Sequence, residues 1–242
     1  MKLDTRVFSD IDALSRGALE ALLHDMHNAI AERGRFAIAL SGGRTPAKMY
    51  ALWGAPGKYR DETPWDRVDM FWGDERYVPA DDPLSNYRMT RETLLSHVPI
   101  PAANVHPAPT SLPTPEKAAE AYDAQLRGFF GAAEPEFDVT LLGLGPEGHT
   151  ASLFPGSPAL EEQRRWVVSV QVAAKPPNRL TFTLPVLNRS RNTYFLVAGK
   201  DKREILAALR SEPDSRPSQY PAGRVRPVDG RVLWLLDQAA AD

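Results

Sequence analysis

The sequence has no cysteine at any of its 242 positions, which excludes disulfide bonds, thiolate nucleophiles, iron–sulfur clusters and cysteine-ligated zinc. It has no apolar run near the roughly 18 residues of a membrane-spanning helix, and residues 1–17 contain no apolar signal core. Charge of one sign is not in excess either, since 29 Lys and Arg face 31 Asp and Glu, for a net charge of −2. This balance argues against nucleic acid or an anionic membrane as the main partner. We therefore expect a cytoplasmic protein in which the positive charges for any anionic ligand are gathered locally.

The composition is otherwise that of an ordinary globular protein, with 43% apolar and 25% charged residues. Neither an internal repeat nor a break in composition divides the chain. Residues 1–242 are therefore expected to form a single domain.

Proline is the one residue type in excess, with 22 copies concentrated in residues 98–115 and 212–227. Both segments are predicted to be rigid surface connections. The alternative for the second segment is that it folds over a pocket and brings Arg216, Arg224 and Arg226 to an anion.

Short apolar runs recur along the chain, as expected of strands that are covered on both faces. They span residues 5–9, 35–40, 68–72, 137–143, 166–172, 179–184, 193–198 and 232–236. Helical patterns lie between several of these runs. The alternation with short connections predicts an α/β fold of Rossmann-like type, with a mostly parallel, doubly wound sheet and helices on both faces.

The helical patterns carry their own start signals. Residues 10–33 repeat apolar side chains every three to four positions, which predicts one buried helix face. Thr45-Pro46 and Thr114-Pro115 each place a capping hydroxyl before a proline at the first helical position. Residues 200–210, after Gly199, are expected to form a further helix.

The segment ALSGGRTPAKMY, residues 39–50, joins an apolar strand to a helix. In a doubly wound sheet this is where ligands bind, and a glycine-rich turn before a helix N-terminus offers free N–H groups to an anion. Ser41 and Thr45 add hydroxyl donors. The segment predicts either a phosphate site or an ordinary tight turn, and it is not a Walker loop because no Gly-Lys-Ser/Thr follows.

The segment FWGDERYVP, residues 71–79, also follows a strand. Asp74, Glu75 and Arg76 are expected where the chain leaves the sheet at the same edge. A carboxylate beside an arginine is often a surface ion pair, but a position at the carboxyl end of a strand favours a functional role.

The segment LLGLGPEGHTASLFP, residues 141–155, contains glycines spaced as G-x-G-x-x-G. A dinucleotide site is not supported, because Pro146 interrupts the motif and no βαβ unit with a terminal acidic residue follows. His149 comes directly after the glycines and is flanked by Glu147. A histidine titrates near neutral pH, so one placed in a ligand crevice suits general acid–base catalysis.

Two basic residues later in the chain, Arg179 and Lys202, become relevant if the anion site is real, because a phosphate dianion needs fixed cations. Other chemistries are absent from the sequence. There is no G-x-S-x-G or H-E-x-x-H motif, and His24 and His27 are expected to point outward from the first helix rather than bind metal.

Taken together, these motifs closely resemble the 6-phosphogluconolactonase family. The matching motifs run in order over residues 36–210 as S-G-G-x-T-P, F-W-G-D-E-R, S-N-Y-x-M, G-L-G-x-x-G-H-T-A-S-L-F-P, P-P-x-R-L-T and the Lys202 segment. The wider superfamily, that of the glucosamine/galactosamine-6-phosphate isomerases, includes glucosamine-6-phosphate deaminase. The resemblance implies hydrolysis of 6-phospho-D-glucono-1,5-lactone in the pentose phosphate pathway, with neither a metal nor an organic cofactor.

The resemblance also implies roles for individual residues. The phosphate would be held by the loop and two cations, namely Ser41, Gly42, Gly43, Thr45, Arg179 and Lys202. His149 would take a proton from the attacking water and return it to the ring oxygen. Asp74 would orient substrate hydroxyls or the imidazole, and Arg76 would stabilise negative charge.

One position departs from the family, which usually has aspartate before Gly-His where this chain has Glu147. Glutamate can substitute if the group only orients the loop or His149, and the rate should suffer if it must touch substrate.

Two other functions stay open as alternatives. A glucosamine-6-phosphate deaminase would need a ring-opening acid that the sequence does not identify. A non-catalytic sugar-phosphate sensor would need a DNA-binding segment for which the chain has no spare length. We expect a small sugar-phosphate lactone as the partner, no binding to nucleic acid or membrane, and a monomer or weak homodimer.

Overall fold

The computed structural model describes residues 3–131, 134–213 and 217–242. The helices are α1 (Ile11–Arg33), α2 (Arg44–Gly54), α3 (Lys58–Asp61), α4 (Asn86–Thr93), α5 (Pro115–Phe130), α6 (Leu184–Leu187), α7 (Arg203–Ser211) and α8 (Gln238–Ala241). The strands are β1 (Thr5–Phe8), β2 (Phe36–Leu40), β3 (Val68–Trp72), β4 (Asp74–Arg76), β5 (Val105–His106), β6 (Val139–Leu142), β7 (Val167–Gln171), β8 (Asn178–Phe182), β9 (Asn192–Val197) and β10 (Arg231–Asp237). No helix in the described ranges is long and apolar enough to cross a membrane.

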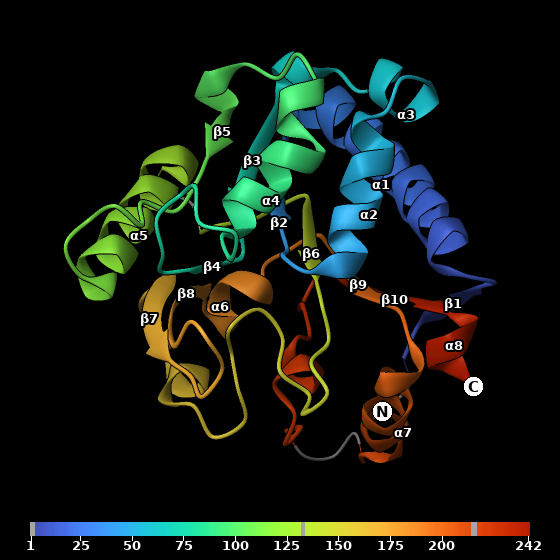
Figure 1. Cartoon of the computed structure of the whole chain (residues 1–242), viewed down its shortest axis with the longest axis vertical. Helices are drawn as coiled ribbons and strands as arrows, with labels where there is room; N and C mark the ends of the chain where they lie inside the picture. Colours follow the sequence, from blue (N-terminus) through green and yellow to red (C-terminus); the bar gives the residue numbers. More distant parts are fainter. Residues whose placement is uncertain (1–2, 132–133, 214–216) are drawn as a thin grey trace.

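Seven strands form one parallel sheet, the large sheet, in the order β1-β10-β9-β6-β2-β3-β5. Successive side chains of a strand point to opposite faces, so each strand contributes to two cores. On β2, Ile38 and Leu40 pack with α1 and α2, whereas Ala37 and Ala39 belong to the core that includes α5 and α7. Figure 1 shows α1 and α2 above the sheet and α7 below it. The predicted α/β fold with helices on both faces is confirmed.

The starts of α1 and α5 are capped by side chains, whereas the cap predicted for α2 does not form. Asp10 caps α1 by accepting from the Ala13 N–H at 2.7 Å, and Thr114 caps α5 as predicted. The prediction for Thr45 is wrong, because α2 already begins at Arg44. Gly43 precedes it with φ of 106°, a value that favours glycine, and no side chain caps this helix. The N–H groups of the first turn of α2 are therefore left without a side-chain cap.

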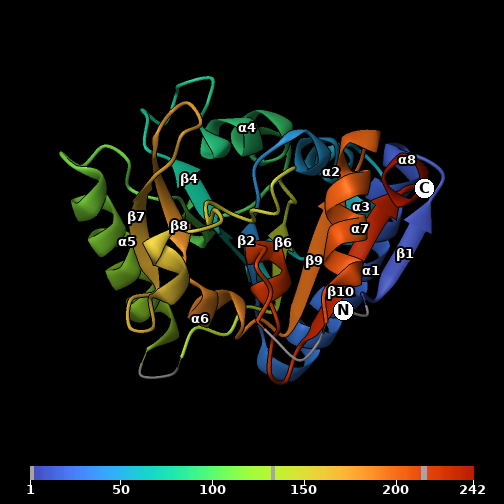
Figure 2. The ribbon, with the colours of Figure 1, turned by 90° about the horizontal axis from the view of Figure 1, so that it is seen from below.

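Strands β4, β7 and β8 form a second sheet, the small sheet, whereas the sequence predicted a single sheet. Strands β7 and β8 are antiparallel and are joined by only six residues, 172–177, which is too short for the crossover that parallel pairing requires. Residues 74–76, expected to be loop, form β4 and pair with β8, so the order is β4-β8-β7. Figure 2 shows this sheet beside α5, at the opposite end of the molecule from β1.

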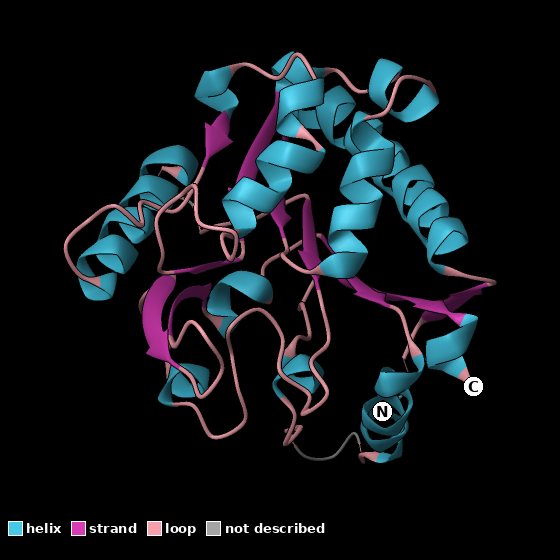
Figure 3. Cartoon of the chain, viewed as in Figure 1, coloured by secondary structure: helices cyan, strands magenta, loops and turns pink. Residues whose placement is uncertain are grey.

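The large sheet changes winding direction between β2 and β6. From β2 the chain continues to β3 on one side, and it later returns to place β6 on the other side of β2. Loops from the carboxyl ends of these two neighbouring strands diverge, which creates the crevice where open α/β sheets bind ligands. Figure 3 shows long loops leaving the sheet at this point.

Candidate active site

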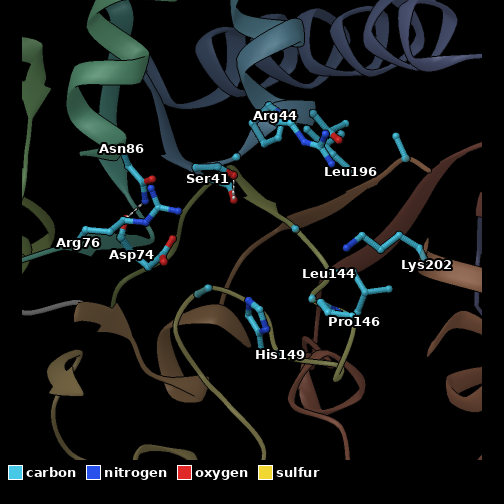
Figure 4. A pocket seen from close by; sticks show the side chains of 18 of the residues that line it. Ser41, Arg44, Asp74, Arg76, Asn86, Leu144, Pro146, His149, Leu196 and Lys202 are labelled. Atoms are coloured by element: carbon cyan, nitrogen blue, oxygen red, sulfur yellow. Dashed lines mark hydrogen bonds between the residues drawn. The ribbon is translucent and has the colours of Figure 1, made fainter. Parts of the chain in front are cut away.

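A pocket of about 280 Å³ lies at this change of direction. Its walls come from the loops after β2, β6 and β9, from the starts of α2 and α4, and from β4 and β8 of the small sheet. Nine of the ten predicted site residues line it: Ser41, Gly42, Gly43, Thr45, Asp74, Arg76, His149, Arg179 and Lys202. Figure 4 shows His149 on one side, Asp74 and Arg76 across from it, and the amine of Lys202 pointing toward the centre.

A buried tyrosine anchors the loop after β2 by two hydrogen bonds to its backbone. The hydroxyl of Tyr50 donates to the carbonyl of Ser41 at 2.9 Å and accepts from its N–H at 3.0 Å. Burial raises the pKa of this hydroxyl far above its ordinary value, so it stays a donor at neutral pH. The turn that follows thus lies at a fixed place above the uncapped start of α2, where backbone N–H groups can bind an anion.

Gly42 is required by a close neighbour rather than by its backbone angles. A Cβ built on it would lie 1.9 Å from Oδ1 of Asn86. Asn86 is buried and donates from Nδ2 to the carbonyl of Asp74 at 2.9 Å. One amide side chain therefore connects the loop after β2 to strand β4.

Glu75 fixes the strand that carries Asp74 and Arg76. Its buried carboxylate accepts three backbone N–H bonds at 2.7 Å, from Arg76, Asn86 and Tyr87. Two of these donors belong to the first turn of α4, where a negative charge is favourable. Burial nevertheless raises the pKa of Glu75 above its ordinary value. Glu75 is thus a structural residue and does not line the pocket.

Arg76 and Arg179 present two positive charges side by side. They are directly opposite in the antiparallel β4–β8 pair. Arg179 is 8% exposed and donates from Nε to the carbonyl of Pro176 at 2.8 Å, while Arg76 donates to the carbonyl of Leu84 at 2.8 Å. Burial, together with the like charge of Arg76, lowers the pKa of Arg179. Like charges placed opposite each other are unfavourable unless an anion joins them.

The loop after β6 is closed by its own hydrogen bonds. Gly145 donates to the carbonyl of His149 at 2.9 Å, and the Thr150 hydroxyl donates to the carbonyl of Gly143 at 2.9 Å. Ser152, further along the loop, donates to Oδ2 of Asp74 at 2.7 Å. The loop is therefore tied to the opposite wall of the pocket through a serine–aspartate bond, while the second carboxylate oxygen of Asp74 is left for a ligand.

The His149 imidazole is packed on both sides. It stacks on Phe154 with 4.1 Å between ring centroids, and a Cβ built on Gly145 would lie 1.9 Å from Nδ1. Nδ1 is buried and lies 3.1 Å from Oε2 of Glu147, a close contact that is not aligned as a hydrogen bond. With Nδ1 covered, Nε2 is the ring nitrogen available to the pocket.

Glu147 is the one predicted site residue outside the pocket lining. Its side chain is 44% exposed and touches the His149 ring from the Nδ1 side. A residue in this position contacts the imidazole rather than a ligand in the pocket.

The cations of the pocket outnumber its carboxylates. Lys202 pairs with its neighbour Asp201 at 2.9 Å, and Arg44 also lines the pocket at the start of α2. With Arg76 and Arg179, these make four cations against the carboxylate of Asp74 among the described residues that line the pocket. The expected local concentration of positive charge is present in a chain whose overall charge is −2.

Sequence reasoning did not single out three contributors, Arg44, Asn86 and Ser152. Arg44 is the variable residue of S-G-G-x-T-P, Asn86 belongs to S-N-Y-x-M, and Ser152 belongs to H-T-A-S-L-F-P. All three therefore lie within the recognised motifs, but the motifs do not indicate their roles. Contacts between segments far apart in the sequence define those roles, and no local pattern encodes such contacts.

The arginines of the second proline-rich segment do not line the pocket. Arg224 pairs with Glu161 at 2.8 Å, and Arg226 donates from Nε to the carbonyl of Gly223 at 2.9 Å. Arg216 lies outside the described residues.

Within the described ranges no group of three or more potential metal ligands occurs, and His24 and His27 are exposed on α1 as expected.

Comparison with known proteins gives consistent results over nearly the whole chain. The model of a family described as glucosamine-6-phosphate isomerases/6-phosphogluconolactonase matches residues 9–234. A 6-phosphogluconolactonase from Synechocystis is 45% identical over 228 residues, which are 93% of this chain and 91% of the relative. A second, from Mycobacterium tuberculosis, is 40% identical over 250 residues, covering 100% of this chain and 98% of the relative.

Solved structures of proteins named 6-phosphogluconolactonase are also similar to this chain. The 6-phosphogluconolactonase of Thermotoga maritima has a TM-score of 0.83 and 31% identity, covering 98% of this chain and 100% of that chain. The enzyme of Trypanosoma brucei has a TM-score of 0.84 and 32% identity, covering 99% and 98%. A monomeric glucosamine-6-phosphate deaminase reaches 0.79 at 20% identity over 99% of each chain, a likeness in fold alone.

Proposed function

The chain belongs to the family of glucosamine-6-phosphate isomerases and 6-phosphogluconolactonases, and from this premise we propose that it hydrolyses 6-phospho-D-glucono-1,5-lactone to 6-phospho-D-gluconate. The reaction is a carboxylic ester hydrolysis and forms part of the pentose phosphate pathway. The observation that carries the proposal is one pocket lined both by cations around the start of α2 and by a histidine whose Nδ1 is buried, which leaves Nε2 for the pocket.

The phosphate group binds at the end of the pocket formed by the loop after β2. Ser41, Gly42, Gly43 and Thr45 surround it, and the uncapped N–H groups of α2 point at it. Arg179 and Lys202 supply fixed cations, for which Lys202 exchanges its partner Asp201 for the phosphate. The phosphate on Arg179 and the negative charge that develops beside Arg76 together offset the repulsion between the two arginines.

His149 then acts as the general base. Its Nε2 takes a proton from a water molecule as the water oxygen bonds to the lactone carbonyl carbon, which gives a tetrahedral intermediate. The intermediate collapses, the bond from this carbon to the ring oxygen breaks, and the ring oxygen receives the proton from Nε2. Acid–base catalysis of this kind contributes roughly 10²–10⁴-fold.

Asp74 and Arg76 complete the reaction site. The free carboxylate oxygen of Asp74 accepts a bond from a substrate hydroxyl, since its other oxygen accepts from Ser152. Arg76 stabilises the negative charge that develops on the carbonyl oxygen, a type of interaction worth about 10²–10³-fold per donor. Glu147 orients the imidazole by its contact with Nδ1.

We further propose that residues 1–242 form one catalytic domain, present in the cytoplasm as a monomer or weak homodimer. The large sheet supplies the phosphate loop and the His149 loop, while β4 and β8 of the small sheet supply Asp74, Arg76 and Arg179 to the same pocket. This shared site supports the proposal of one domain.

The test is hydrolysis of freshly prepared 6-phosphogluconolactone, coupled to 6-phosphogluconate dehydrogenase and corrected for spontaneous opening. We expect strong acceleration that survives EDTA, since the proposed chemistry assigns every step to side chains. Loss of activity with EDTA would contradict the metal-free step. Absence of acceleration, together with release of ammonia from glucosamine 6-phosphate, would instead identify a deaminase.

A further inference from the structure

The second proline-rich stretch contacts the catalytic loop through its backbone and a tyrosine. Residues 218–225, hereafter the Tyr220 segment, contain the short helical turn Pro221–Arg224. Figure 3 shows this part of the chain running beside the loop that follows β6. The N–H of Ala222 donates to the carbonyl of Gly148 at 3.0 Å, which joins the segment to the residue directly before His149.

The contact at Gly148 is close-packed. Gly148 has φ of 82°, and a Cβ built on it would lie 2.6 Å from Cδ1 and 2.8 Å from Cβ of Tyr220. The side chain of Tyr220 thus covers the Cα of Gly148. The hydroxyl of Tyr220 makes no hydrogen bond within the part of the chain that the structure describes, so the contact depends on the ring.

The Tyr220 segment is anchored independently of the loop it touches. Ser218 is buried and donates to the carboxylate of Glu212, and Arg224 donates from Nε to the carbonyl of Ser218 at 2.9 Å. At the other end Asn188 donates to the carbonyl of Arg224 at 3.1 Å and accepts from the N–H of Arg226 at 2.6 Å. These bonds make the segment a fixed surface against which the loop rests.

The imidazole itself has little hydrogen-bonded support. Its Nδ1 contacts Glu147 but has no aligned hydrogen bond within the described part of the chain, so the ring is held mainly by stacking on Phe154 and by the backbone turn through Gly145 and Gly148. The direction of the ring therefore depends on the backbone at Gly148. A catalytic group displaced by about 1 Å can lose on the order of 10²-fold in rate.

We propose that Tyr220 is a positioning residue for His149, acting by packing its ring on Gly148 and so fixing the turn that aims Nε2 into the pocket. Tyr220 is not among the residues that line the pocket. The inference rests on the proposed role of His149 as the base. It gives the second proline-rich segment a function that differs from the anion binding considered for its arginines.

The experiment compares Tyr220→Ala, Tyr220→Phe and Gln219→Ala with the unaltered protein in the lactone assay. Tyr220→Ala removes the ring and is expected to lower kcat by about tenfold or more, with KM changed less than about twofold. Tyr220→Phe keeps the ring and is expected to retain most of kcat. Gln219→Ala alters the exposed neighbour, whose side chain takes no part in the contact, and is expected to leave both constants unchanged.

The outcomes separate this inference from the proposed function. If His149→Ala abolishes catalysis and Tyr220→Ala leaves kcat unchanged, or raises KM alone, the positioning role is wrong while the base stands. If His149→Ala has no effect, the proposed mechanism fails first. Equal loss in Gln219→Ala would also overturn the proposal. Should Tyr220→Ala not fold, as judged by its thermal transition, Tyr220→Leu takes its place, because leucine fills part of the space without a ring.

Discussion

Arg76 and Arg179 lie directly opposite each other on neighbouring antiparallel strands, so the small sheet holds two positive charges together at the edge of the pocket. Arg179 is almost fully buried there, and both burial and Arg76 lower its pKa. A pair of this kind is unfavourable in the empty protein and favourable once an anion bridges it. Under the proposed function, the pair contributes to binding of the anionic substrate rather than to stability of the fold.

We therefore expect Arg179→Gln to raise KM by about tenfold or more, since a charge-assisted bond to phosphate is worth roughly 1.5–3 kcal/mol. Lys202→Ala should raise KM in the same way, whereas Lys200→Ala, an exposed lysine of the same helical turn, should not. Steady-state kinetics on the lactone measures all three. Unaltered KM in both Arg179→Gln and Lys202→Ala would mean that the phosphate binds elsewhere.

Gly42→Ala should disturb the phosphate loop, because its Cβ would overlap the Asn86 amide. We expect a higher KM and a lower thermal transition, with partial recovery of both in the double variant Gly42→Ala/Asn86→Gly. The matched control is Gly128→Ala, a helical glycine with no atom near its Cβ position. That variant should gain about 1 kcal/mol of helix stability with unchanged KM. Absence of recovery in the double variant would show that the steric reading of Gly42 is wrong.

Glu147→Asp tests the departure from the family pattern. Glu147 is not among the residues that line the pocket and contacts the Nδ1 side of His149, so shortening it by one methylene should change kcat less than about threefold and leave KM unchanged. Glu147→Gln, which keeps the length but loses the charge, should lower kcat more than the aspartate variant does. A large gain in kcat for Glu147→Asp would contradict this account and show the native glutamate to be poorly placed.

Glu162 gives a pH-dependent contribution to stability. Backbone N–H donors of Arg164 and Arg165 lower its pKa to about 2, against an ordinary value near 4.3. A carboxyl whose pKa is lowered by folding stabilises the protein fully above its ordinary pKa and loses that effect as the pH falls toward the lowered value. The stability difference between the unaltered protein and Glu162→Gln should thus be constant from pH 7 to about 5 and shrink below about 4.

Urea unfolding at pH 7, 5, 4 and 3 measures this difference. Glu120→Gln, at an exposed glutamate, is measured in parallel as the control. A difference for Glu162→Gln that stays constant down to pH 3 would contradict the lowered pKa.

Local patterns in the sequence predicted much of the fold. Six of the eight apolar runs became strands of the large sheet, whose parallel strands are buried on both faces, whereas the runs at 166–172 and 179–184 became β7 and β8 of the small sheet. Helix α1 followed from its apolar spacing between Asp10 and Gly34. The small sheet was missed because β4 is three residues long and its pairing with β8 joins positions about a hundred residues apart. No propensity in D-E-R indicates a strand, and the cross-strand partner alone produces it.

Most residues that line the pocket were also predictable from the sequence, whereas the residues that support them were not. Motif residues predicted to touch substrate, such as Ser41 and His149, lie together in one pocket. The supporting residues were not recognised, because Tyr50, Asn86 and Tyr220 act through packing and hydrogen bonds to segments distant in sequence. Their roles depend on tertiary geometry that no single motif carries.

The most direct test of the account compares kcat and KM of His149→Ala with those of the unaltered protein on freshly prepared 6-phosphogluconolactone. If His149 is the base, kcat should fall by roughly 10²–10⁴-fold while KM changes little, since the phosphate site is untouched. An unchanged kcat would remove His149 from the reaction and contradict the proposed mechanism.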